Sequence, residues 1–197
     1  TDIQKQRIPG SVVKILTDAE EKLRMLEQAG QEQKITIGNT YASGNYLYRI
    51  TGDSTAEAAG IQKDLEQVIR IPDTVVFGNK SYRVTSIQSS AFTKKKAAEV
   101  TIGKNVEQIG KNAFANCKKL KKTVIKSTKL KEIGNKAFRG CTAMKTITIK
   151  SKVIKKIGKH AFQGISKKAV IKVPAKKRKD YTKLLKKAGL NKKIKIK

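Results

Sequence analysis

A short motif that recurs at a nearly constant spacing constrains the fold of this chain more than any other feature. The string Ile-x-x-x-Ala-Phe occurs four times, ending at Phe92, Phe114, Phe138 and Phe162, so the phenylalanines lie 22, 24 and 24 residues apart. Each copy has another apolar residue three positions before its isoleucine, and the last three copies carry glycine directly after the isoleucine. Self-similarity at a period of about 20–50 residues is typical of solenoids and other repeat architectures.

A run of alternating apolar and polar residues separates successive phenylalanines. The runs are Val100–Ile102, Thr123–Ile125, Ile147–Ile149 and Ile171–Val173, with a further copy upstream at Ile69–Ile71. Alternating β-branched residues predict strands. One strand per repeat favours parallel stacking on the equivalent strand of the next repeat. The Ile-Gly-x-x-Ala-Phe segment is then expected to form the opposite wall as a short helical or 3₁₀ turn.

The segments before and after the repeats are expected to cap the solenoid. The predicted organisation is an amphipathic helical segment in residues 1–33, a β-rich cap in residues 34–68, the solenoid in residues 69–174, and a helical cap with a basic tail in residues 175–197. Helices are expected at Thr17–Ala29 and Arg178–Ala188, where apolar residues follow helical spacing. Strands are expected at Tyr46–Thr51 and Thr55–Ala58, with Ile35–Ile37 as a further pairing partner. The Gly78-Asn79 pair predicts a hairpin turn.

One repeat shows most clearly which known pattern this sequence follows. Cys141-Thr-Ala-Met144-Lys-Thr-Ile147-Thr-Ile149, continued by Ile154, Ile157-Gly158 and Ala161-Phe162, resembles the BspA-like leucine-rich repeat of bacterial surface proteins. The resemblance covers about residues 45–190. Departures are Lys95 and Ile165 in place of cysteine, Thr123 in place of isoleucine, and an insertion at Val75–Arg83.

The resemblance implies a particular fold class and location. The fold would be an α/β solenoid, the right-handed leucine-rich-repeat superhelix with a parallel sheet on one face. The location would be secreted or on the bacterial cell surface, with the signal peptide removed. The family implies binding of macromolecules and no catalytic residue or cofactor. No run of the sequence approaches the roughly 18–20 apolar residues that span a bilayer.

Positive charge is concentrated in the repeats. The net charge is +30, yet residues 1–80 hold 10 Lys+Arg against 11 Asp+Glu, whereas residues 81–197 hold 35 against 4. A net charge of about 2–8 is enough for the solubility of a small domain, so the excess favours anionic partners. Lysine outnumbers arginine 32 to 3 in residues 81–197. Because the lysine ammonium is a point charge and not a planar fork, general attraction is favoured over specific readout.

The outward face of the predicted strands is the candidate binding surface, because such sheets carry the binding surfaces of solenoids. The predicted ligand-binding residues are Thr101, Lys122, Val124, Lys126, Thr146, Thr148, Lys150 and Lys172. The expected function is that of a non-enzymatic extracellular module for adhesion or ligand capture. Its partner would be a host extracellular protein, an acidic glycan or an anionic cell-wall polymer.

Two other functions remain open from the charge pattern. The first is sequence-independent binding of nucleic acid, for which only Tyr82 and Tyr181 remain in the repeat region as stacking residues once the phenylalanines are placed in the core. The second is attachment to a membrane surface through the basic helix at Arg178–Ala188.

Few residues in the chain suit catalysis. Cys117 and Cys141 share one repeat position, so their strands would bring them within reach of a disulfide; free, buried thiols are favoured over that alternative. His160 occupies a repeat position that also accepts Ser, Asn and Lys and is therefore expected to face solvent. A single histidine makes His-ligated metal sites and histidine-based catalysis improbable. We predict no enzyme activity, no metal and no cofactor.

Overall fold

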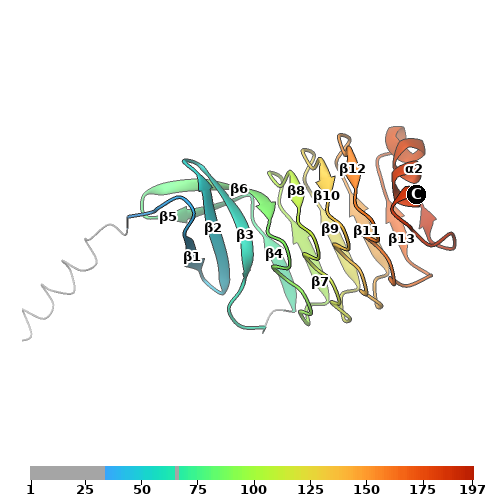
Figure 1. Ribbon diagram of the computed structural model, residues 1–197, viewed down its shortest axis with the longest axis horizontal. Helices are drawn as coiled ribbons and strands as arrows, with labels where there is room; N and C mark the ends of the chain where they lie inside the picture. The colour runs from blue at the N-terminus through green and yellow to red at the C-terminus, as the bar shows by residue number, and fades with distance from the viewer. Residues whose placement is uncertain (1–33, 65–66) are drawn as a thin grey trace, which may run out of the picture. The chain divides into compact units, whose positions relative to one another are not determined.

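The repeats stack as successive rungs of a solenoid, and two walls of parallel strands run along it (Figure 1). The computed structural model describes residues 34–64 and 67–197. The helix expected at Thr17–Ala29 lies outside these residues. The predicted solenoid class is confirmed. No helix within the described part of the chain is long and apolar enough to cross a membrane.

The first wall, which we call sheet B, holds the strands predicted from the alternating runs. Its strands are β4 (Val68–Ile71), β7 (Glu99–Ile102), β9 (Lys122–Ile125), β11 (Thr146–Ile149), β13 (Val170–Lys172) and β14 (Lys195–Ile196). They lie side by side in this order, and every pairing is parallel. Inward side chains such as Val100 and Ile147 are buried, while the alternate side chains are half-buried or exposed. The period of two in the sequence therefore marks the inner and outer faces of sheet B.

The opposite wall belongs to sheet A and differs from the expectation. Its rungs consist of β6 (Lys80–Ile87) and three two-residue strands, β8 (Gln108–Ile109), β10 (Glu132–Ile133) and β12 (Lys156–Ile157). Each two-residue strand is followed by turns and not by the short helix or 3₁₀ turn that the sequence had suggested.

Backbone conformation explains why no helix forms on this wall. The residue two positions before each phenylalanine has a φ of 56–63°, and these residues are Ser90, Asn112, Lys136 and His160. A left-handed residue interrupts a right-handed helical turn. The backbone amides bond instead across rungs, as Phe114 N–H does to Ala137 O at 2.8 Å. His160 shares this conformation, and its backbone N–H donates to Ala188 O. The residue was expected to face solvent, and it is half-buried.

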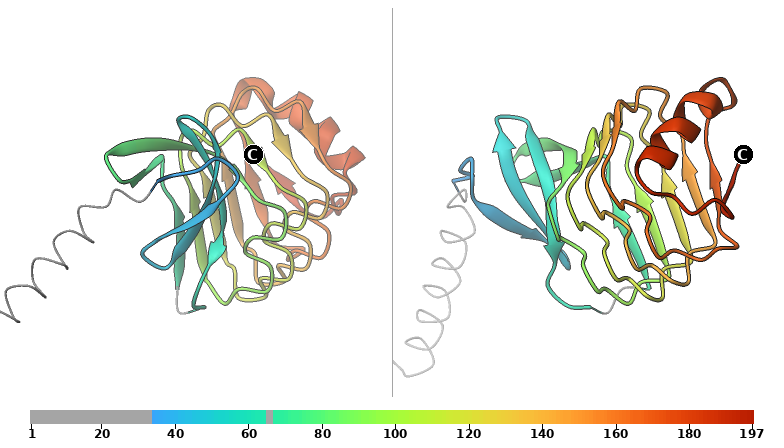
Figure 2. Two further views of the ribbon diagram at one scale, coloured as in Figure 1. Left: turned by 60° about the vertical axis from the view of Figure 1, so that its left-hand side comes forward. Right: turned by 45° about the vertical axis from the view of Figure 1, so that its right-hand side comes forward.

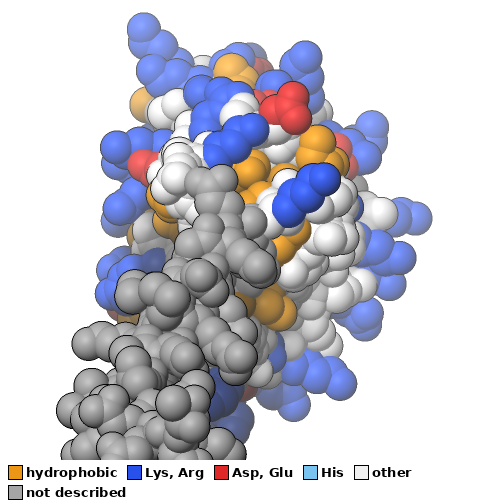
Figure 3. Space-filling view, turned by 90° about the vertical axis from the view of Figure 1, so that its left-hand side faces the viewer, with side chains coloured by type: hydrophobic (Ala, Val, Ile, Leu, Met, Phe, Trp, Pro, Cys, Tyr) orange, Lys and Arg blue, Asp and Glu red, His pale blue; other side chains and the backbone are white. Residues whose placement is uncertain are grey.

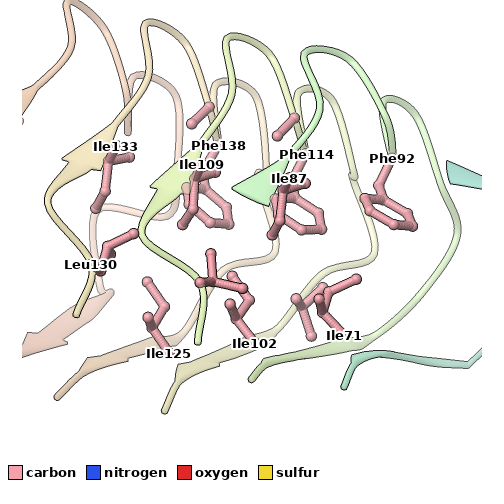
Figure 4. Packing of buried hydrophobic residues seen from close by; sticks show 14 of the residues in the cluster. Ile71, Ile87, Phe92, Ile102, Ile109, Phe114, Ile125, Leu130, Ile133 and Phe138 are labelled. Atoms are coloured by element: carbon pink, nitrogen blue, oxygen red, sulfur yellow. The ribbon is translucent and has the colours of Figure 1, made fainter. Parts of the chain in front are cut away.

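The four motif phenylalanines form one column between the walls. Figure 4 shows three of them, Phe92, Phe114 and Phe138. Neighbouring ring centroids are 5.3, 5.2 and 5.4 Å apart, and the ring planes differ by 9°, 9° and 5°. All four rings are buried. Because each ring contacts the equivalent ring one rung away, a single repeat cannot complete this core and stacking of repeats is required.

The motif glycines let the rungs approach closely. A Cβ added at Gly134 would lie 2.7 Å from backbone atoms of Gly110 and Lys111 in the preceding rung. Any side chain at Gly134 would therefore push the two rungs apart.

An antiparallel cap closes the N-terminal end of sheet A. It consists of β1 (Thr40–Ser43), β2 (Tyr46–Gly52) and β3 (Thr55–Ile61), and β3 pairs in parallel with β6. The hairpin of β5 (Thr74–Phe77) and β6 turns at Gly78-Asn79 as predicted, and it projects from the first rung (Figure 2). The pairing expected of Ile35–Ile37 was wrong. Ile37 and Gly38 form a turn, with Gly38 at a φ of 93°, so the pairing strand begins later, at Thr40.

The C-terminal end is closed by a helix and one more strand. After the 3₁₀ helix η1 (Ala175–Lys177), helix α2 (Arg178–Lys187) buries Tyr181 and Leu185 against the last rung (Figure 2). The Tyr181 hydroxyl accepts the Ile154 N–H at 2.9 Å and donates to Ser151 O at 3.1 Å. The tail that follows was expected only to be basic, yet its residues Lys195–Ile196 form β14 and extend sheet B.

Candidate interaction surface

The outer face of sheet B brings the predicted ligand-binding residues together. Strand register places Thr101, Val124, Thr148 and Lys172 in one row across four strands. Lys122 and Thr146 stand in the neighbouring row, beside Glu99 of β7. Lys126 and Lys150 directly follow β9 and β11. The four lysines are exposed, and the threonines and Val124 are half-buried.

Charges on this outer face are only partly compensated. Lys122 Nζ lies 3.3 Å from Glu99 Oε2, with both side chains about half exposed, so this pair adds little stability. Among the described residues, no carboxylate lies within 4.0 Å of the amines of Lys126, Lys150 or Lys172. The part of the outer face around Lys126, Lys150 and Lys172 therefore presents uncompensated positive charge.

A groove of about 390 Å³ opens at the carboxyl ends of β11 and β13. Three predicted residues, Thr148, Lys150 and Lys172, line it. The sequence interpretation missed the other lining residues, which are Thr128, Ile149, Lys152, Val173 and Pro174. Those residues lie outside the alternating strand runs or on the inward side of a strand. The prediction took only the outward-facing residues of those runs, so it did not include them. The groove combines an apolar floor with three ammonium groups.

A second groove, of about 520 Å³, lies where the chain turns toward sheet B. Its lining consists of Lys94, Lys95, Lys96, Asn116, Lys118 and Lys119. The runs Lys94–Lys96 and Lys118–Lys119 are at least 22 residues apart in sequence. They meet because equivalent positions of adjacent rungs are neighbours. We call this feature the five-lysine groove. Seen from the side drawn in Figure 3, blue lysine and arginine side chains stand out around the outline of the molecule, with few acidic ones among them.

The cysteines are structural. Cys117 and Cys141 are free and buried, which confirms the favoured interpretation. Each thiol donates to a phenylalanine carbonyl of the preceding rung at 3.1 Å, Cys117 to Phe92 and Cys141 to Phe114. The neighbouring Cys117 thiol, together with burial, raises the pKa of the Cys141 thiol above its usual range, which opposes formation of a nucleophilic thiolate.

Comparison with known proteins agrees with this geometry. Residues 77–192 match the BspA-type leucine-rich repeat region in six copies. The chain belongs to the BspA-type leucine-rich repeat family. This family is a repeat module and not a catalytic family, and the resemblance stated from the sequence is confirmed.

Solved structures of leucine-rich repeat proteins have a similar fold. A leucine-rich repeat protein from Bacteroides ovatus is 30% identical with a TM-score of 0.58, and the match covers 68% of this chain and 37% of that one. One from Bacteroides capillosus is 30% identical with a TM-score of 0.61, and the match covers 69% and 99%. A leucine-rich cell surface protein from Faecalibacterium prausnitzii, at 24% identity and a TM-score of 0.54 over 68% and 45%, shares the fold. Among curated proteins, no sequence matches this chain.

Proposed function

We propose that this module binds an anionic macromolecule at the bacterial cell surface or after secretion, using the outer face of sheet B. The partner class is an acidic glycan or an anionic cell-wall polymer, and the module acts in adhesion or ligand capture without catalysis. The observation that carries the proposal is the group of lysine ammoniums at the groove beside β11 and β13, which no described carboxylate neutralises.

The distribution of the few carboxylates supports attraction to polyanions. All four acidic residues of residues 81–197 already pair with a lysine: Glu99 with Lys122, Glu107 with Lys131, Glu132 with Lys156 and Asp180 with Lys177. Most of the 35 basic residues in this region therefore lack an acidic partner within it. Gathering like charges in the five-lysine groove costs free energy in the unbound protein, and a bound polyanion would reverse that cost.

The alternatives have less support. Tyr82 and Tyr181, the two stacking candidates for nucleic acid, are 3% and 1% exposed, so neither offers a ring face to a base. The apolar side of α2 is occupied, because Tyr181 and Leu185 pack on the last rung and are not available to insert into a membrane.

A pair of matched variants tests the proposal. The first carries Lys126→Glu, Lys150→Glu and Lys172→Glu on the outer face of sheet B. The control carries Lys111→Glu, Lys155→Glu and Lys159→Glu. These lysines flank the short strands of sheet A, are also exposed and form no ion pair with a described residue. Both variants change the net charge by the same amount, so any difference between them reports location and not total charge.

The readout is the salt concentration that elutes each protein from immobilised polygalacturonate and from purified bacterial wall. We expect the outer-face variant to elute at clearly lower salt than the control. Equal elution of the two variants would contradict the assignment to sheet B. Retention of the wild type that persists in about 1 M salt, where the screening length is about 3 Å, would contradict the electrostatic mechanism. Displacement by DNA but not by free polygalacturonate would favour the nucleic-acid alternative.

A further inference from the structure

A polar trough crosses the outer face of sheet A, on the wall opposite to the proposed polyanion surface. It consists of two adjoining hollows of about 410 and 300 Å³, and Ser86 and Gln108 line both of them. At one end the trough begins at the turn between β2 and β3, with Thr51 and Thr55, and at the other it reaches Lys129. It therefore follows the solenoid across the join between the cap and the first rungs. The larger hollow has the size of a small-molecule site, commonly about 300–1,000 Å³.

The floor of the trough is a row of polar side chains held in register. Arg49 pairs with Glu57, Glu57 with Ser86, and Ser86 with Gln108 across strands β2, β3, β6 and β8. Arg49 Nε lies 2.6 Å from Glu57 Oε1, and Ser86 Oγ donates to Glu57 Oε2 at 3.4 Å. Glu57 is only 8% exposed, although it lies on the outer face of the sheet. A carboxylate so deeply buried is tolerated because the guanidinium and the hydroxyl compensate it, and this leaves the row preorganised.

The charge of the trough departs from that of the rest of the repeats. Its charged lining residues are Arg49, Arg83, Lys129, Glu57 and Glu107, and Arg49 already pairs with Glu57. The Glu107 carboxylate also pairs, with Lys131. The remaining lining is mostly hydroxyl and amide: Thr51, Thr55, Thr85, Ser86, Asn105 and Gln108. A polyanion entering here would meet two carboxylates, whereas the five-lysine groove offers it none.

We propose that this trough binds a neutral oligosaccharide. Sugar hydroxyls both donate and accept hydrogen bonds, and the trough supplies both functions in one place through amide and hydroxyl groups, the Glu57 carboxylate and the Arg49 guanidinium. Successive rungs are spaced by about 4.8 Å along the trough. An extended chain lying on it contacts equivalent positions of consecutive rungs. This site is separate from the outer face of sheet B, so the two proposals stand or fall independently.

The test is a titration of the ¹⁵N-labelled protein with neutral oligosaccharides, followed by NMR. The probes are tetramers of β-1,4-linked glucose, α-1,4-linked glucose and β-1,4-linked N-acetylglucosamine. We expect at least one probe to shift the backbone amides of Arg83, Ser86 and Gln108, with the same affinity at low salt and in about 1 M salt. No shift of these amides with any probe would overturn the proposal, as would binding that is lost at high salt.

Two variants that fill the trough, and one matched control, make the assignment specific. Gln108→Tyr places a ring at the residue shared by both hollows, and Thr51→Tyr does so at the far end, so either alone suffices if the other folds poorly. Lys155→Tyr introduces the same ring two rungs away, at an exposed position that lines neither hollow. We expect each trough variant to weaken binding by at least about tenfold and the control to leave it unchanged. Unchanged binding in both trough variants would place the ligand elsewhere and refute the inference.

Discussion

The phenylalanine column predicts that the same substitution costs more in the middle of the solenoid than at its ends. Phe114 and Phe138 each stack on two rings, whereas Phe92 and Phe162 each stack on one. All four are at most 3% exposed, so replacing any of them by leucine removes nearly the same apolar surface. The number of ring pairs lost is therefore the main difference between the positions.

The expected loss in the free energy of unfolding follows from the number of aromatic ring pairs that each substitution removes. An aromatic pair contributes about 0.5–1.5 kcal/mol beyond the burial of its area. Phe114→Leu loses two pairs and Phe162→Leu loses one, so the free energy of unfolding should fall further in Phe114→Leu by about 0.5–1.5 kcal/mol. A full truncation, Phe114→Ala, adds a cavity and should cost about 3–5 kcal/mol.

Urea unfolding followed by far-ultraviolet circular dichroism measures these differences. Comparison requires a single transition with the same dependence on urea in every variant. Phe92→Leu serves as the second terminal control. If the terminal and central variants lost the same free energy, the stacked column would be a geometric consequence of the repeat and not a source of stability.

The remaining predictions concern the close packing of rungs, the C-terminal cap and the buried thiol. Gly134→Ala should lower the free energy of unfolding by about 1–3 kcal/mol, because its Cβ would meet the backbone of the preceding rung; a gain in stability, the usual result where a glycine has room, would show that the rungs are looser than described. Tyr181→Phe should cost about 1–3 kcal/mol and speed amide exchange at Ile154, whose N–H loses its buried acceptor; unchanged exchange would be inconsistent with that bond. Because the neighbouring Cys117 thiol and burial raise the pKa of Cys141 in the folded protein, only the unfolded thiol ionises above about pH 8.5. The free energy of unfolding should therefore fall there by up to about 1.4 kcal/mol per pH unit. Urea titrations between about pH 8 and 10 should show that the free energy of unfolding falls less steeply with pH in Cys141→Ala than in the wild type. The same dependence on pH in both proteins would count against the assignment to Cys141.

Where sequence interpretation succeeded, it relied on residues that repeat. The motif isoleucines and phenylalanines and the alternating runs each predicted a contact with the equivalent residue one rung away, and the structure has those contacts. The cysteine position was expected to hold free, buried thiols, and it does. The alternation also selected six residues that lie on one face of sheet B, while Lys126 and Lys150 directly follow its strands β9 and β11. Helix α2 and the hairpin at Gly78-Asn79 followed from local spacing and turn chemistry.

Where the sequence interpretation failed, local preference was overridden by contacts between rungs. The Ile-Gly-x-x-Ala-Phe segments were expected to form a short helical or 3₁₀ turn, but Ser90, Asn112, Lys136 and His160 share a left-handed backbone that interrupts such a turn. Ile194-Lys-Ile196 has the alternation of a strand, but the segment is too short to predict one from sequence. Its extended conformation depends on backbone pairing with β13.

The sequence by itself determined the rung, because a repeated residue in a solenoid meets its own equivalent and the period therefore encodes the contact. Only the tertiary structure decided where non-repeating residues gather. The five-lysine groove joins two turns from adjacent rungs, and the polar trough joins the cap, the hairpin strand β6 and two repeat loops. Such sites depend on how far apart distant segments end up after packing, and no local pattern of charge or hydropathy records that distance.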